Sequence, residues 1–200
     1  MRQKIAFSAL LITAGVVFGP STALAYDEAR AKMLSYTCAG CHGTDGVSVG
    51  PASPSLAGMA EDTFTDAMET FKSGERPSTI MERIAKGYSE QDIALMAKFF
   101  AAQEYQKAQG QAFDTDKAKR GKKLHKKHCE KCHEEGGTID VDGSGILAGR
   151  WKAYLEYSLE DYNDGSREAT KKMAKKLEKV RETEGQEGFD ALIHYYISQR

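Results

Sequence analysis

Apolar residues along the chain recur three and four positions apart, and the segments with this spacing come in matching pairs. Such spacing places apolar side chains on one face of an α-helix. The helices predicted in this way cover residues 27–36, 61–71 and 89–103, and again 117–128, 151–162 and 188–198. No segment alternates convincingly in the manner of a β-strand, so the sequence predicts an all-α fold.

Several of these helices have recognisable ends. Ser89 is predicted to cap the N-terminus of its helix, with Asp92 in the capping-box position where Glu is more usual. Gly74 and Gly165 follow the two middle helices and suit the left-handed position that ends a helix. The segments predicted to be loops are 43–54 and 136–145.

The first 25 residues have the build of a secretory signal peptide. Arg2 and Lys4 give a positive start, residues 5–18 are apolar, and Ala23-Leu24-Ala25 supplies small residues for cleavage. A transmembrane anchor is the alternative, but 14 apolar residues are short for a bilayer. We therefore expect cleavage after Ala25, export to the periplasm, and no membrane span in the mature chain.

The four cysteines occur in two copies of one pentapeptide, Cys38-Ala39-Gly40-Cys41-His42 and Cys129-Glu130-Lys131-Cys132-His133. The pattern C-x-x-C-H is the attachment signal for c-type haem, in which the thiols form thioethers and the histidine binds iron. A zinc ribbon would place its cysteine pairs about 15–20 residues apart, a thioredoxin motif would explain neither histidine, and disulfides would not explain the shared pattern. The sequence therefore predicts two covalently bound haem c groups.

A shift of 91 residues superimposes more than the two motifs. The further matches are Leu56-Ala57-Gly58 on Leu147-Ala148-Gly149, Phe71 on Tyr162, and Gly74 on Gly165. With one residue added, Met81 falls on Met173. The chain is thus a tandem repeat, for which we predict haem domains at 26–109 and 110–200.

The residue opposite the histidine on each iron decides the chemistry, because a methionine there closes the site to substrate and raises the potential. Of the methionines, Met81 has a methionine partner in the repeat, Met173, and this pair is predicted to supply the distal ligands. Met68 and Met96 are predicted to fill the core. The remaining histidines, which we do not expect to bind iron, are His125, His128 and His194.

Charge adds a further distinction between the halves. The whole chain carries a net charge of −1, and −3 without the signal peptide, which argues against a nucleic-acid binder. Lysines are dense before and within the second haem motif, over 117–131, and around Met173, over 171–179. These runs are either solvated helix faces or a basic rim that steers an electron-transfer partner.

Two positions stay open at this stage. Pro54 falls on Gly145 under the 91-residue shift, so the backbone carbonyl that would orient His133 is not identified. Trp151 packs either on the second haem or in ordinary core.

The two C-x-x-C-H units, with the segments 80–89 and 171–176 around the paired methionines, resemble the dihaem cytochrome subunit of flavocytochrome c sulfide dehydrogenase. The resemblance implies tandem cytochrome c-like domains that pass electrons from an FAD-containing flavoprotein subunit to an external acceptor, such as a small cytochrome. It implies an electron-transfer subunit without catalytic residues of its own. The corresponding haem-binding residues are Cys38, Cys41, His42 and Met81, and then Cys129, Cys132, His133 and Met173.

Two other classes compete with this interpretation. A cytochrome c4-type shuttle has similar tandem architecture and works without a flavoprotein. A haem enzyme such as a peroxidase needs one haem without a strong distal ligand, and the two matched methionines oppose it.

Overall fold

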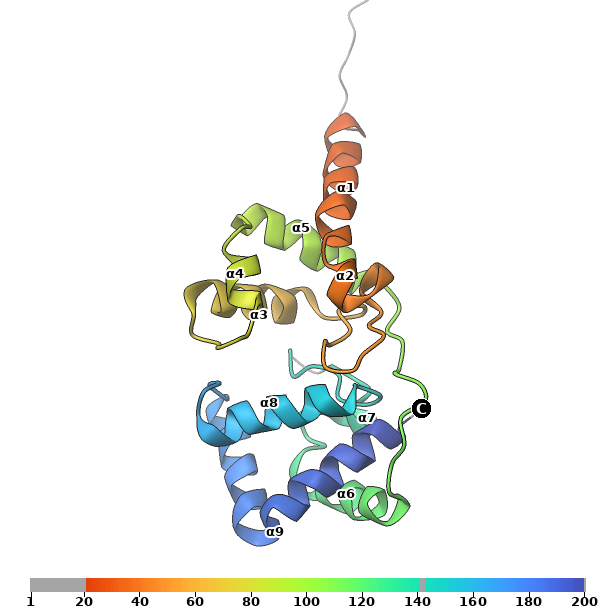
Figure 1. Ribbon diagram of the computed structural model, residues 1–200, viewed down its shortest axis with the longest axis vertical. Helices are drawn as coiled ribbons and strands as arrows, with labels where there is room; N and C mark the ends of the chain where they lie inside the picture. Colours follow the sequence, from red (N-terminus) through yellow and green to blue (C-terminus); the bar gives the residue numbers. More distant parts are fainter. Residues whose placement is uncertain (1–20, 141–142, 200) are drawn as a thin grey trace, which may run out of the picture.

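The computed structural model describes residues 21–140 and 143–199, and all their regular secondary structure is helical (Figure 1). The predicted all-α class is therefore confirmed. Most of the predicted signal peptide, residues 1–20, lies outside the described residues. The elements are α1 Ser21–Tyr36, α2 Ala39–His42, the 3-10 helix η1 Thr44–Gly46, α3 Glu61–Ser73, α4 Met81–Ala85, α5 Glu90–Ala101, α6 Thr115–His128, α7 Glu134–Gly137, α8 Lys152–Asp164 and α9 Lys171–Ser198.

The predicted helix ends are present. The Ser89 hydroxyl accepts from the backbone N–H of Asp92, and the Asp92 carboxylate accepts from the backbone N–H of Ser89, which completes a capping box. Gly74 and Gly165 end α3 and α8 in the left-handed conformation, with φ of 83° and 81°. A residue with a Cβ would be strained at these two positions.

The predicted helix over 188–198 lies in the second part of α9, which consists of two helical stretches that meet at a kink at Gly185, with φ 63° and ψ −159°. The first stretch, residues 171–184, was not predicted as helix. It is rich in Lys, Glu and other strong helix formers. In the first half the corresponding region is divided into the short α4 and the separate α5.

The first half of the molecule, α1–α5, has its own hydrophobic cluster. Helix α5 contacts both α1 and α3, and the Phe64 and Phe100 rings lie 5.4 Å apart between centroids. Met68 and Met96 are buried in this cluster, as predicted for core residues. The cluster is made of Leu56, Phe64, Met68, Ala85, Ile93, Met96, Ala97 and Phe100.

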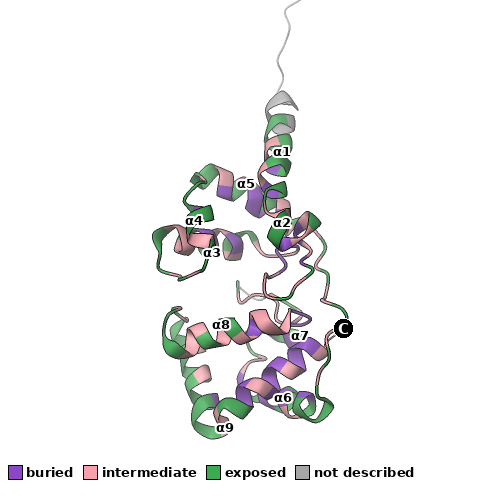
Figure 2. Ribbon diagram, in the orientation of Figure 1, coloured by how far each residue is buried: buried purple, intermediate pink, exposed green. Residues whose placement is uncertain are grey.

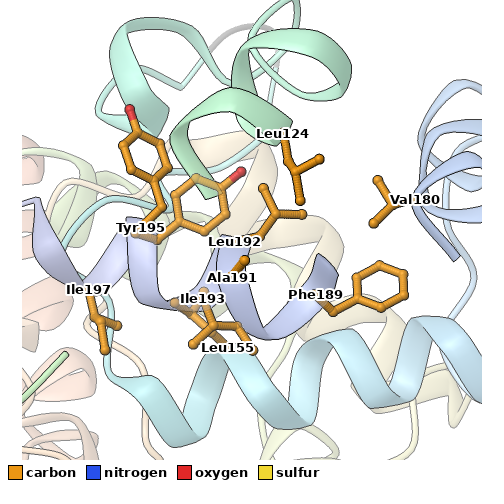
Figure 3. Close-up of a cluster of buried hydrophobic side chains, with 10 residues drawn as sticks. Leu124, Leu155, Val180, Phe189, Ala191, Leu192, Ile193, Tyr195 and Ile197 are labelled. Atoms are coloured by element: carbon orange, nitrogen blue, oxygen red, sulfur yellow. The ribbon is translucent and has the colours of Figure 1, made fainter. Parts of the chain in front are cut away.

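The second half, α6–α9, has a separate cluster centred on the C-terminal part of α9 (Figure 3). Helix α9 packs against α6 on one side and α8 on the other, and its buried face holds most of the apolar side chains. Figure 2 shows this burial along the inward side of α9, with exposed residues on the outer surfaces. The cluster is made of Leu124, Leu155, Val180, Phe189, Ala191, Leu192, Ile193, Tyr195, Tyr196 and Ile197.

In Figure 1, α3 of the first half and α8 of the second face each other across the junction of the halves, with loops of both halves beside them. The segment between α5 and α6 runs along this junction, where the Tyr105 hydroxyl donates to the Ala148 carbonyl at 2.9 Å. At the same junction, Trp151 Nε1 donates to the Ser48 carbonyl at 3.2 Å, and the Trp151 ring lies against Gly50. Trp151 therefore packs on a loop of the first half.

In the described part of the chain, no helix is both long enough and apolar enough to cross a membrane.

The close crossing of α6 and α9 depends on Gly121. A Cβ added at this residue would lie 2.0 Å from the Ala191 carbonyl oxygen and 2.7 Å from the Tyr195 Cβ. We expect Gly121→Ala to lower the free energy of unfolding by about 1–3 kcal/mol, the usual cost of overpacking a helix contact. Guanidinium unfolding followed by circular dichroism measures this change.

The control is Lys122→Ala, which alters an exposed position of the same helix. If Gly121→Ala were as stable as Lys122→Ala, the helix crossing described here would be wrong.

Candidate haem sites

Each Cys-x-x-Cys-His motif forms one tight turn. In the first motif the backbone N–H groups of Cys41 and His42 donate to the Cys38 carbonyl at 3.2 and 2.9 Å. In the second, Cys132 and His133 donate to the Cys129 carbonyl at 3.1 and 3.0 Å. All four thiols are free of disulfides, and in each pair one is half-buried and the other exposed. The same local geometry is thus built twice.

The two motif histidines are oriented by backbone carbonyls. His42 Nδ1 lies 2.8 Å from the Pro54 carbonyl oxygen, and His133 Nδ1 lies 3.3 Å from that of Gly145. Because a carbonyl only accepts hydrogen bonds, the proton lies on Nδ1 and the Nε2 lone pair is left for a metal. This arrangement fits the axial ligand of a haem iron. It also answers the second open position, since Gly145 supplies the carbonyl for His133.

Burial favours the neutral form of both imidazoles. It lowers the pKa of His42 and of His133 below the ordinary value, while the hydrogen bonds to Pro54 and Gly145 act in the opposite direction. Burial also raises the pKa of the Cys38 and Cys129 thiols. The neutral imidazole is the form that binds a metal ion.

The two paired methionines lie at corresponding places in the fold. Met81 is the first residue of α4 and packs, half-buried, against the first hydrophobic cluster. Met173 lies in the first turn of α9, half-buried, and its backbone N–H donates to the Thr170 hydroxyl at 3.3 Å. By contrast, Met33 is 74% exposed on the helix that precedes the first motif.

The other histidines have contacts of their own. His125 is buried with its Nδ1 3.0 Å from the Tyr196 hydroxyl, and His194 Nδ1 accepts from the backbone N–H of Asp114 at 2.9 Å. His128 is buried on α6, and its Nε2 has no hydrogen-bond partner in the described structure. His125 and His128 lie on the helix that leads into the second motif, as predicted.

The lysine runs of α6 and α9 come together beside the second motif. The charges of Lys127, Lys176 and Lys179 help burial to lower the pKa of His128, and Lys176 also lowers the pKa of Cys129 against the effect of burial. These lysines are exposed. The first motif has no such set of lysines around it in the sequence.

Three arginines at the junction of the halves were not singled out in the sequence. Arg76 and Arg167 follow the glycines that end α3 and α8, and Arg150 is buried just before α8. The 91-residue shift superimposes Arg76 on Arg167, so the comparison of the two repeats could have identified this pair. Arg150 falls on Met59 and had no such signal.

Known proteins with similar sequences are c-type cytochromes, although no family model matches the chain. The cytochrome subunit of sulfide dehydrogenase from Chlorobaculum tepidum is 47% identical over 73 residues, which are 36% of this chain and 66% of that protein, just under two thirds. The resemblance inferred from the sequence is thereby confirmed. Cytochrome c4 from Pseudomonas aeruginosa is 32% identical over 171 residues, or 79% of this chain and 81% of that protein.

The fold also matches a solved structure. Reduced recombinant cytochrome c4 from Pseudomonas stutzeri superimposes with a TM-score of 0.72 and 26% identity, over 87% of this chain and 98% of that one. The tandem helical architecture, the two Cys-x-x-Cys-His turns and these similarities agree. The chain therefore belongs to the cytochrome c4 family of dihaem c-type cytochromes, with two covalently bound haem c groups and a role in electron transfer.

Proposed function

We propose that the cysteines of the two turns form the thioether bonds and that one histidine and one methionine bind each iron. The first haem then has Cys38, Cys41, His42 and Met81, and the second has Cys129, Cys132, His133 and Met173. The haem iron supplies one-electron chemistry when bound. The chain's own residues orient the imidazoles through backbone carbonyls and occupy the sixth coordination position, which leaves no place for a substrate.

The proposal on ligands is supported by the hydrogen bonds of the imidazoles and by the places of the methionines. The bonds to Pro54 and Gly145 direct a free Nε2 away from the backbone in each half. Each methionine lies in the first turn of the helix that follows a middle helix and its loop. We further propose that residues 26–109 and 110–200 form the two haem domains, because each range contains one hydrophobic cluster and one motif.

We propose that the chain is the cytochrome subunit of a sulfide dehydrogenase of the flavocytochrome c type. In this role it accepts electrons from an FAD-containing flavoprotein subunit and passes them to an external acceptor such as a small cytochrome. The observation that carries the proposal is the 47% identity with the cytochrome subunit of sulfide dehydrogenase. The ligation proposed above agrees with it, because such a subunit transfers electrons and leaves substrate oxidation to its partner.

A cytochrome c4-type shuttle without a flavoprotein is the second candidate. It is favoured by the match to cytochrome c4 over 79% of the chain, which is longer than the match to the sulfide dehydrogenase subunit. Either role places the protein in the periplasm, after cleavage behind Ala25. That cleavage would remove the first residues of α1.

Replacing either methionine is expected to leave one haem iron without its sixth ligand. We expect Met81→Ala and Met173→Ala each to lose about half of the methionine–iron charge-transfer absorption, to bind carbon monoxide at one haem, and to lower that haem's reduction potential. Optical spectra and a redox titration of the holoprotein measure all three changes.

The control is Met96→Leu, which alters a buried methionine of the first cluster and keeps its volume nearly constant. Its spectrum and both potentials are expected to match those of the parent. The ligand assignment is wrong if the two alanine variants keep the full charge-transfer absorption and exclude carbon monoxide.

Isolation from the native host separates the two candidate functions. A tagged chain purified from cells grown with sulfide is expected to bring one FAD-bearing polypeptide in a one-to-one ratio, and added sulfide is expected to reduce the haems. Flavin fluorescence and haem absorbance quantify the ratio. A chain that emerges alone and stays oxidised with sulfide would instead support the shuttle.

A further inference from the structure

Each half of the repeat has one arginine with the same contacts, Arg76 in the first half and Arg167 in the second. Arg76 and Arg167 are 91 residues apart, and the backbone N–H of each donates to a carbonyl of the preceding helix, at 3.0 and 2.9 Å. The guanidinium carbon of Arg76 lies 4.5 Å from the ring centroid of Phe71, and that of Arg167 lies 4.4 Å from the ring centroid of Tyr162. Phe71 and Tyr162 are themselves equivalent in the repeat. The two side chains are therefore held in the same way by equivalent residues.

Arg150 adds a third cation between the halves. It is 6% exposed, and its Nε donates to the Ile146 carbonyl at 2.8 Å. Its Nη1 donates across the junction to the Ser55 carbonyl of the first half at 2.6 Å. Its guanidinium carbon lies 5.4 Å from the ring centroid of Tyr105 and 5.9 Å from that of Tyr154. Among the described residues, the groups that hold this charge at the boundary are neutral.

The three arginines act together on Tyr154 of α8. Burial would by itself raise the pKa of this phenol, but the charges of Arg150, Arg76 and Arg167, with a smaller effect of the hydrogen bond to Ser158, outweigh burial and lower the pKa to about 7. One of these arginines comes from the first half and two from the second. The junction therefore has a positive potential that both repeats create.

No acidic side chain of the described residues neutralises this charge. None of the three arginines takes part in an ion pair, whereas other arginines such as Arg30 and Arg120 are paired with carboxylates. Asp66 is close enough to Tyr162 to raise its pKa, but it is exposed and forms no ion pair with Arg167. A partly buried cation without a partner is costly, so the arrangement calls for anions that belong to the complete protein.

The haems themselves carry suitable anions. Each c-type haem has two propionate carboxylates, on the edge of the ring opposite its thioether bonds. A planar guanidinium binds a carboxylate with two parallel hydrogen bonds, and one arginine per repeat matches one haem per repeat. We propose that Arg76, Arg150 and Arg167 bind the propionates of the two haems at the junction and thereby raise both reduction potentials. This inference rests on the haem ligation proposed above.

The test compares Arg76→Gln, Arg150→Gln and Arg167→Gln in the full holoprotein. Because positive charge favours the reduced iron, each variant is expected to show at least one haem with roughly a threefold to tenfold smaller equilibrium constant for reduction. A tenfold change is 59 mV for one electron. The propionate bending bands in resonance Raman spectra are also expected to shift. The matched control is Arg181→Gln, which alters an exposed arginine bonded to Glu178 and is expected to change neither readout.

The haem content of each protein is measured first, because it distinguishes a failure of this inference from a failure of the proposed haem ligation. A parent protein with fewer than two haems would contradict the ligation, whereas a parent with two haems leaves only the arginines under test. If all three variants keep two haems, the parental potentials and the parental propionate bands, the inference is overturned, even where stability falls. Where a glutamine variant fails to incorporate haem, the corresponding Arg→Lys variant is measured in its place. If the propionate band of that lysine variant equals the parental band, the arginine does not bind the propionate with two hydrogen bonds.

Discussion

The structure of each haem site depends on the hydrogen bond between the Nδ1 of the motif histidine and a backbone carbonyl twelve residues later. This bond keeps the proton on Nδ1, leaves Nε2 free, and prevents the ring from turning. It also ties the loop after each Cys-x-x-Cys-His turn back to the motif. In the same loops, Leu56 and Ala57 donate to the Gly46 carbonyl, and the equivalent Leu147 and Ala148 donate to that of Gly137. The same hydrogen bonds therefore orient the motif histidine and fix the loop that follows it.

The two halves keep this feature and differ around it. The first half has the short α4 and the separate α5 in its C-terminal region, whereas the corresponding stretches of α9 in the second half are separated only by the kink at Gly185. Lys127, Lys176 and Lys179 lie near the second motif, and the sequence around the first motif has no such set of lysines. Under the proposed ligation, both haems have the same axial ligands in different electrostatic surroundings. A difference in nearby charge can give two haems different reduction potentials even when their axial ligands are the same.

Much of the fold and site could be predicted from sequence, because the responsible signals are local or repeated. Helix spacing, the Ser89 cap and the glycines that end α3 and α8 were all recognisable. The helical stretch over residues 171–184, before the kink of α9 at Gly185, was missed, because its high helix propensity comes from Lys and Glu and not from apolar spacing. Trp151 and Arg150 could not be placed, because their partners Ser48 and Ser55 belong to the other half. Contacts between halves leave no periodic pattern in the sequence.

The most direct test of the central claim is the mass of the intact chain after export and complete denaturation. The account predicts a single species that equals the processed polypeptide plus two haem groups and keeps its colour in acidic acetone. A mass with one haem or none, or pigment that passes into the solvent, would contradict the view that each half is built around a covalently held haem.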